Sequence, residues 1–418
     1  MSYPNKIKNT ILYNRFLERK ENEIRNLFED HKISMTPFCT LDNYIRYRNN
    51  IDMNVEFNTN RFIFGVQKKS FIKMSKLNID HPLINFKDIL TKYKDYDIHT
   101  VIPIDNLIYA SNNIIKITQY FENILNNHVN LLPKDIINGF QVRETLNNDQ
   151  YFTIVIKLQL FNEDYFHIWA SIEDQIVDKM ISVFSENLIL ASIYKQITNN
   201  KKKPTNKDPY YLIYKKCNLI QKIEKLKFSI SPGAFFQVNI RTATYMYKKI
   251  RELYINKIKE LGIDIKKVCI FDICCGTGTI GLFLSDYANK VIGFEINKNA
   301  ISDCIENSKI NQKNNTKYIQ GPVEDTIHQT INILEDTNYL IPIVNPPKRG
   351  LYEPVLEILN KYSNKVEFFI YVSCNPKSFY KDYKKLENNF VISKIILLDQ
   401  FPLTNDSEII VLFEKKNI

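Results

Sequence analysis

Two side chains late in the sequence are suited to covalent chemistry. Cys374 follows an apolar run at residues 368–372 and precedes an Asn-Pro turn, and Glu408 precedes a second apolar run at residues 409–413. Each run predicts a buried strand, so the thiol and the carboxylate would lie at the mouths of two strands and could share one pocket. In such a pocket the thiol could attack an electrophile and the carboxylate could accept a proton.

A glycine-containing loop has the features of a cofactor site. Gly276 and Gly278 follow a short apolar strand pattern, and glycine lets a backbone approach a ligand closely with positive φ. Glu295 ends the next predicted strand, where a carboxylate can bind ribose hydroxyls. Gly276, Gly278 and Gly281 have the GxGxxG spacing, so the loop alone would also fit a dinucleotide. Asp272 stands before the loop, and this detail favours S-adenosylmethionine.

The tripeptide Asn345-Pro346-Pro347 follows a later predicted strand. Because the carboxyl ends of strands line the ligand crevice in such a sheet, we expect this segment beside the cofactor loop. Taken alone, it is similar to a motif of amino-group methyltransferases that act on adenine, in which an aromatic residue follows the prolines. Lys348 stands there instead, which weakens that interpretation.

The elements that must position these groups form an α/β sheet. From Val268 onward, strand patterns alternate with helical patterns, which predicts a Rossmann-like, doubly wound and mostly parallel sheet. The last two strands are close in sequence and predict a C-terminal antiparallel hairpin. With a boundary near Pro232-Gly233, we predict a catalytic domain at residues 231–418 and an N-terminal α+β RNA-binding region at residues 1–230.

The region before the boundary is expected to mix helices and strands. Apolar spacing predicts helices at 5–31, 114–125 and 241–261, strands at 44–66 and 226–230, and a strand meander through 141–143, 152–160 and 166–170. The lysine-rich segment 201–209 is interpreted as a solvated hairpin tip whose charges could touch RNA.

Composition narrows the function classes. The 418 residues are 44% hydrophobic and carry a formal net charge of +10, which fits a polyanionic partner and a lysine-rich solubilising surface equally well. The seven cysteines include no CxxC pair, so we expect no metal site and a reducing compartment. No apolar stretch approaches ~20 residues and no signal-peptide pattern occurs, so we expect no membrane span.

Four segments together resemble the RNA uracil-5-methyltransferase family, and within it the tRNA (uracil-54-C5)-methyltransferases. They are residues 228–239, 272–281, 371–376 and 399–413. The resemblance implies S-adenosyl-L-methionine as cofactor, tRNA as substrate and 5-methyluridine as product. We further expect a monomer acting in the cytoplasm or nucleus, with mitochondrial action also open.

The resemblance also implies residue roles. Cys374 would add to carbon 6 of uracil, and Glu408 would remove the proton from carbon 5. Phe235 stands where the family places an aromatic residue near the flipped base, and Arg48 lies in a stretch like the one that begins the RNA-facing domain. The expected cofactor-binding residues are Gln237, Cys274, Gly276, Thr279, Glu295 and Asn345.

Three positions depart from the family pattern. The family has Asp at the position of Asn345, normally Arg at that of Lys348, and usually His at that of Asp406. The departures keep open a second hypothesis, a tRNA-binding or folding module with weak or lost catalysis, although the retained Cys374 and Glu408 argue against it. A second acid near Glu408 would raise its pKa by like-charge repulsion. An amino-methyltransferase would have no use for Cys374.

Overall fold

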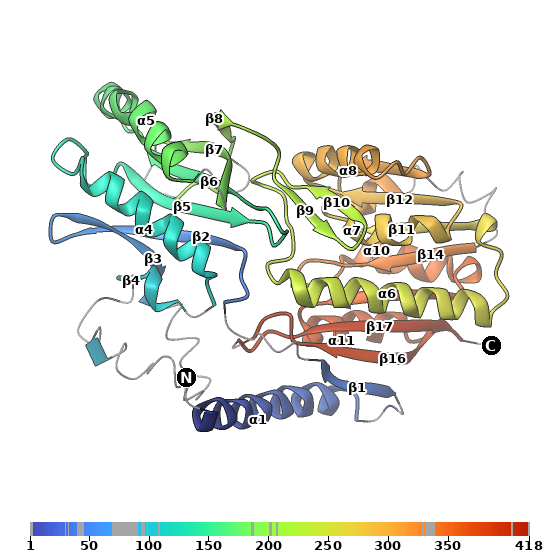
Figure 1. Cartoon of the computed structure of the whole chain (residues 1–418). Coiled ribbons are helices and arrows are strands. Elements are labelled where there is room, and N and C mark those ends of the chain that lie inside the picture. The colour runs from blue at the N-terminus through green and yellow to red at the C-terminus, as the bar shows by residue number, and fades with distance from the viewer. Residues whose placement is uncertain are drawn as a thin grey trace.

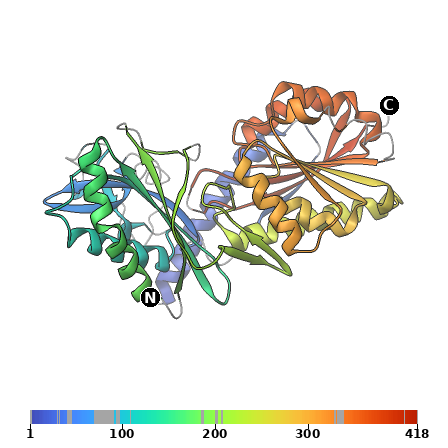
Figure 2. The ribbon, with the colours of Figure 1, turned by 90° about the horizontal axis from the view of Figure 1, so that it is seen from above.

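The computed structural model describes residues 3–29, 31, 33–39, 46–68, 91–92, 97, 99–107, 109–184, 188–199, 203–205, 208–327, 330, 339–402 and 404–416. They form two α/β bodies side by side, each built on one large sheet (Figure 1 and Figure 2). The N-terminal half of the chain makes most of one body, and the C-terminal half makes most of the other.

The C-terminal body is built on eight strands. They are β1 (Ser34–Cys39), β11 (Val268–Ile273), β12 (Lys290–Glu295), β13 (Thr316–Gln320), β14 (Tyr339–Val344), β15 (Phe368–Ser373), β16 (Phe390–Leu398) and β17 (Glu408–Lys415). Their order in the sheet is β1-β16-β17-β15-β14-β11-β12-β13. Strands β11 to β15 pair in parallel, and β17 runs antiparallel to β15 and β16. The predicted Rossmann-like sheet with a C-terminal antiparallel hairpin is therefore confirmed.

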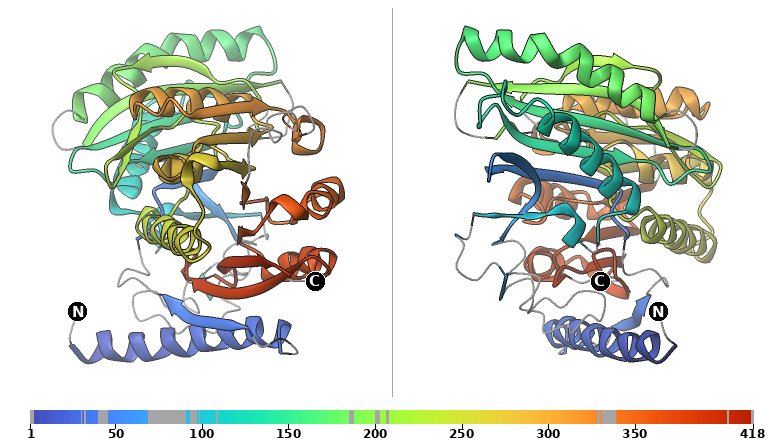
Figure 3. Two further views of the ribbon diagram at one scale, coloured as in Figure 1. Left: turned by 90° about the vertical axis from the view of Figure 1, so that its right-hand side faces the viewer. Right: turned by 60° about the vertical axis from the view of Figure 1, so that its left-hand side comes forward.

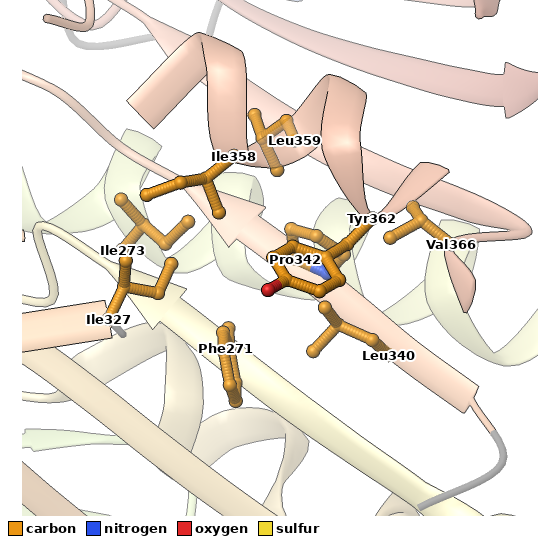
Figure 4. A pocket seen from close by; sticks show the side chains of 9 residues that line it. All are labelled: Phe271, Ile273, Ile327, Leu340, Pro342, Ile358, Leu359, Tyr362 and Val366. Atoms are coloured by element: carbon orange, nitrogen blue, oxygen red, sulfur yellow. The ribbon is translucent and has the colours of Figure 1, made fainter. Parts of the chain in front are cut away.

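Helices cover both faces of this sheet. They are α6 (Ile240–Glu260), α7 (Thr279–Leu284), α8 (Lys298–Ile310), α9 (Val323–Thr326), α10 (Glu353–Lys361) and α11 (Pro376–Leu386). Buried residues of α6 and α7 belong to one core, and those of α10 and α11 belong to a second. In the second core, β11, β14 and α10 enclose an apolar cavity of only about 10 Å³ (Figure 4). It is too small for an organic ligand, so this region is packing interior.

Two elements that begin the chain belong to this C-terminal body. β1 extends the sheet by pairing in parallel with β16, and α1 (Tyr3–Leu27) lies beside them (Figure 3). Ile24 and Phe28 join the core that α11 closes, and the Phe28 ring is 6.0 Å from that of Phe379. The structure thus differs from the predicted division at residue 230 in this one segment, because β1 completes the C-terminal sheet. Elsewhere that division stays a prediction.

The N-terminal body contains a seven-stranded sheet and two long helices. Its elements are β2 (Asn50–Asn58), β3 (Arg61–Gln67), β4 (Val101–Pro103), α4 (Asn112–Asn126), β5 (Ile137–Glu144), β6 (Gln150–Gln159), α5 (Glu163–Val183), β7 (Leu188–Thr198) and β8 (Tyr211–Lys215). The sheet order is β4-β3-β2-β5-β6-β7-β8, and α4 and α5 bury their apolar residues in its core. A two-stranded ribbon, β9 (Ile220–Ile223) and β10 (Leu226–Ser229), leads into the C-terminal body.

One predicted strand is a helix. Residues 166–170 were expected to form a strand but lie within α5. Asn162 caps this helix by accepting a hydrogen bond from the backbone N–H of Tyr165 (3.0 Å), and Trp169 and Ile172 belong to its buried apolar face. Because β6 and β7 are parallel neighbours, their connection needs a crossover, which α5 provides. Long-range strand pairing therefore overrides the local strand pattern.

Other expectations for the N-terminal region fare better. The three predicted helices correspond to α1, α4 and α6. In the lysine-rich segment, residues 201–202 and 206–207 lie outside the described residues. Lys203 is not a solvated tip, because its Nζ lies 2.8 Å from a carboxylate oxygen of Asp52. No helix in the described part of the chain is long and apolar enough to cross a membrane.

Candidate active site

The glycine loop between β11 and α7 is shaped by an unusual backbone. Cys274, Gly276 and Gly278 adopt positive φ values of 60°, 56° and 75°. A Cβ atom at Gly278 would lie 3.0 Å from the hydroxyl oxygen of Tyr318 and 3.2 Å from Sγ of Cys304. Both the backbone conformation and the tight packing therefore require glycine at this position.

Two carboxylates hold the loop in place. Buried Asp272 accepts a hydrogen bond from the N–H of Gly281 (2.8 Å), and burial raises the pKa of Asp272 to about 7. Glu295 accepts hydrogen bonds from the N–H groups of Gly276 (3.0 Å) and Asn297 (2.9 Å). Since each carboxylate oxygen has more than one lone pair, Glu295 can still accept from ribose hydroxyls.

A cavity of about 620 Å³ opens at the carboxyl ends of β11, β12, β14 and β15. This volume falls within the usual range for small-molecule sites. Every predicted site residue except Arg48 lines it: Gln237, Cys274, Gly276, Thr279, Glu295, Asn345, Phe235, Cys374 and Glu408. The sequence motifs therefore converge on one cavity, although their individual roles stay predictions.

Cys374 and Glu408 lie at the same edge of the sheet. In the antiparallel pair of β15 and β17, Ser373 lies opposite Ile409. The residue after Ser373 and the residue before Ile409 therefore leave the paired strands on the same side. Asn375 then caps α11, so the chain turns into a helix directly after the thiol.

Burial and neighbouring charges set the proton affinity of both groups. Burial and, to a smaller extent, the negative charge of Asp406 together raise the pKa of Glu408 to about 8; the effect of Asp406 has the sign expected from the sequence. Burial also raises the pKa of the Cys374 thiol to about 11, where Glu408 adds to the rise and Lys348 opposes it. Lys348 forms an ion pair with Asp406, and both are largely exposed. Two of the three departures from the family pattern are therefore in contact with each other.

Two contacts around the cavity carry no signal in the sequence. Gln400 donates from Nε2 to Oε1 of Gln237 (2.9 Å), so it orients a predicted cofactor residue. The hydroxyl of Tyr47 donates to the carbonyl oxygen of Pro402 (3.2 Å), which joins the N-terminal body to the loop before Glu408. Gln400 and Pro402 stand in a segment that carries the family resemblance, but their partners follow only from the fold.

Arg48 lies apart from the cavity lining. Its guanidinium group lies over the ring of Tyr109 (5.2 Å) and near that of Tyr47 (6.0 Å). Its Nε is buried, and no described residue accepts a hydrogen bond from it. Arg48 is therefore held between the rings of Tyr109 and Tyr47. Tyr47 is also the residue that hydrogen-bonds Pro402 in the C-terminal body.

The fold and the cavity together define a class of protein. A mostly parallel sheet, a glycine loop after one strand, an acidic residue at the end of the next and a cavity at the carboxyl ends are the architecture of a nucleotide-type cofactor site. Three features fit S-adenosylmethionine: the loop with positive φ values, the buried Asp272, and Glu295, which accepts two hydrogen bonds from backbone N–H groups. The chain is an S-adenosylmethionine-dependent methyltransferase. It belongs to the tRNA (uracil-5-)-methyltransferase family, whose family model matches residues 86–416.

Relatives carry related names. A putative RNA methyltransferase of Acanthamoeba polyphaga mimivirus is 36% identical over 198 residues, covering 47% of this chain and 50% of the viral protein. The match thus spans about half the length of that relative. An uncharacterized RNA methyltransferase of Clostridium tetani is 26% identical over 97% of this chain and 81% of its own length. The human tRNA (uracil-5-)-methyltransferase homolog B is 28% identical over 54% of this chain and 45% of its own length.

A solved structure shows the same fold. The tRNA (uracil-54, C5)-methyltransferase of Pyrococcus abyssi, determined in complex with S-adenosyl-L-homocysteine, aligns with a TM-score of 0.64. The alignment covers 96% of this chain and 83% of the archaeal chain at 18% sequence identity. Both the α/β sheet and the N-terminal body are therefore shared in outline.

Proposed function

We propose that the protein transfers a methyl group from S-adenosylmethionine to carbon 5 of a uridine in tRNA. The observation that carries this proposal is the placement of Cys374 and Glu408 at one edge of the sheet, in the cavity that the cofactor loop also lines. A thiol nucleophile and a buried base are what substitution at carbon 5 of uracil requires, because that carbon is a poor nucleophile until a thiolate adds to carbon 6.

Cys374 acts as the nucleophile. Its thiolate adds to carbon 6, and the resulting enolate makes carbon 5 nucleophilic. The thiol pKa of about 11 means that the thiolate is scarce in the free protein. The positive charge of Lys348 lowers that pKa, so the ammonium group favours formation of the thiolate.

Glu408 acts as the base. After methyl transfer it takes the proton from carbon 5, the electrons of that C–H bond restore the double bond between carbons 5 and 6, and the bond from carbon 6 to Sγ of Cys374 breaks. A carboxylate with a pKa of about 8 is a better proton acceptor near neutral pH than an ordinary one. Burial therefore suits Glu408 to this step.

The remaining cavity residues bind and orient. When bound, S-adenosylmethionine supplies an electrophilic methyl group. Glu295 would hold its ribose, and Gln237, Cys274, Thr279 and Asn345 would surround the rest.

The uridine must leave its stack to reach the thiol. Phe235 lines the cavity yet is 62% exposed, so its ring is available to stack on the extruded base. Arg48, a partly exposed residue beside Tyr47 and Tyr109, would contact the RNA beside it.

The test is nucleoside analysis of tRNA that lacks 5-methyluridine, after incubation with labelled S-adenosylmethionine. We expect labelled 5-methyluridine from the wild type and none from the matched Cys374→Ala protein. A labelled amino-methylated purine would contradict the proposal. Binding of tRNA without any labelled product would favour the alternative, a tRNA-binding or folding module.

A further inference from the structure

We propose that Lys20 and Tyr13 of α1 are positioning residues that hold Asp399 and thereby place the base Glu408. This inference rests on the proposed function, because it gives α1 a role in the proton-transfer step. Residues 3–39 lie outside the segment that the family model matches, residues 86–416. The first helix of the chain therefore supplies part of the support of the active site.

The contact between α1 and Asp399 is deeply buried. Lys20 Nζ lies 2.9 Å from Oδ1 of Asp399, and their side chains are only 3% and 1% exposed. The hydroxyl of Tyr13 donates to Oδ2 of Asp399. Both carboxylate oxygens are thus held by α1, so removing either partner leaves a buried acceptor without its donor.

Asp399 is placed next to the catalytic base. It directly follows β16, and the last residue of that strand, Leu398, lies opposite Glu408 in the antiparallel pair of β16 and β17. A displacement of Asp399 therefore moves the strand end against which Glu408 is registered. On its other side, Leu398 pairs with Cys39 of β1. β1 and α1 therefore both contact the end of β16, at Leu398 and Asp399.

The same loop also reaches the cofactor residues. Gln400 donates to Oε1 of Gln237 and to the carbonyl oxygen of Asn239 (3.3 Å), and Asn239 donates back to the carbonyl oxygen of Gln400 (3.3 Å). Phe401 lines the cavity. Every residue from Asp399 to Phe401 thus makes a contact that shapes the site.

Burial changes the proton affinity of the anchoring pair. It lowers the pKa of Lys20 to about 7 and raises that of Asp399 to about 7. Burial therefore disfavours the charged form of both groups, unlike in an exposed ion pair. Such a buried pair adds little stability compared with an apolar one, which points to its geometric role.

A second buried lysine provides a matched control. Lys257 Nζ lies 2.9 Å from Glu414 of β17 and 2.7 Å from Glu260, and its side chain is 5% exposed. Glu414 stands at the other end of β17 from Glu408, opposite Phe368. Lys257→Met therefore breaks a buried lysine–carboxylate pair on the same strand without touching the cavity.

The experiment compares full-length wild type, Lys20→Met, Tyr13→Phe and Lys257→Met. The measurements are thermal unfolding, S-adenosylhomocysteine affinity, KM for tRNA, kcat, and the amount of denaturation-resistant protein–RNA adduct. We expect kcat of Lys20→Met to fall by about tenfold to a hundredfold, the usual cost of a small misplacement of a reacting group, with little change in KM. Methylated adduct should accumulate, because proton removal is the slowed step. Lys257→Met should lose stability and keep its kcat.

The outcomes distinguish a failure of the positioning role from a failure of the proposed function. A folded Lys20→Met protein with wild-type kcat, or an equal loss of kcat in Lys257→Met, would overturn the inference and leave the proposed function standing. A wild type that makes no 5-methyluridine would overturn both. If Lys20→Met does not fold, Tyr13→Phe decides, since it removes one hydrogen bond and keeps the buried pair; its kcat should fall by about fivefold.

Discussion

The two ends of the cavity are built from different kinds of contact. At the cofactor end, Asp272 and Glu295 bind backbone N–H groups that are 9 and 19 residues away in sequence. At the thiol end, the loop before Glu408 is held by Tyr47 and Lys20, whose contacts span 355 and 379 residues. The glycine loop at one end is held by neighbouring strands of one sheet, and the other end is assembled from both bodies of the molecule.

This difference has a functional consequence. The glycine loop at the cofactor end is fixed by nearby contacts, so cofactor affinity should change little when parts of the chain away from the Gln400–Gln237 contact change. The thiol end depends on long-range contacts, so remote substitutions should affect the reaction more than cofactor binding. The predictions below test that separation.

The largest effect is expected from Cys374→Ala. Methyl transfer should be abolished because the thiol forms the bond to carbon 6, while affinity for S-adenosylhomocysteine should remain near that of the wild type. Activity assays and calorimetric titration check the two halves. Substantial turnover by the alanine protein would falsify the nucleophile assignment.

Glu408→Gln should stop the reaction at a later point. The thiol can still add and the methyl group can still transfer, but the proton at carbon 5 remains. A covalent protein–RNA adduct should accumulate and survive denaturing gel electrophoresis. An inactive variant that forms no adduct would remove Glu408 as the base and make Asp406 the next candidate.

Gly278→Ala should damage the cofactor end alone. The new methyl group meets Tyr318 and Cys304 at 3.0–3.2 Å, so affinity for S-adenosylhomocysteine should fall by about tenfold, as for a loss of ~1.4 kcal/mol. Gly262→Ala is the matched control, because Gly262 also has a positive φ, of 62°, but a Cβ there has no neighbour within 4 Å. Equal affinity losses in both variants would mean that backbone strain, and not packing at the loop, governs binding.

The smallest effect concerns pH. Glu408 must be ionised to act, so kcat/KM should rise with pH through the Glu408 pKa of about 8. Asp406→Asn removes a like charge and should shift this rise to lower pH. A pH–rate profile of both proteins checks the direction. An unshifted profile would mean that the ion pair with Lys348 already cancels the charge of Asp406.

The same pKa predicts a stability change of defined sign. The folded pKa of Glu408 lies above its ordinary value of 4.5, so folding disfavours the ionised form. The stabilisation from protonated Glu408 is present below about pH 4.5 and is lost as pH rises through about 8. In thermal unfolding, Glu408→Gln should therefore gain most over the wild type above pH 8.

Much of the C-terminal body could be predicted from the sequence, and particular failures show why the rest could not. Strand and helix periods predicted the parallel sheet, because buried parallel strands are continuous apolar runs. Residues 166–170 were misassigned because their helix is required by the parallel pairing of β6 and β7, which the local pattern does not contain. The segment from Tyr3 to Cys39 was assigned to the wrong body, because the sequence of an edge strand does not indicate which strand it pairs with.

The sequence by itself determined the chemistry of this protein: a thiol, a carboxylate and a glycine loop, each at the end of a predicted strand. Those motifs are local, because the backbone conformation and the neighbouring strand specify them within a few residues. Only the tertiary structure decided how the reacting groups are held. Glu408 acquires its raised pKa from burial, and Asp399 acquires Lys20 and Tyr13 as partners from the other end of the chain. Burial and long-range contacts are properties of the folded chain, so no local pattern records them.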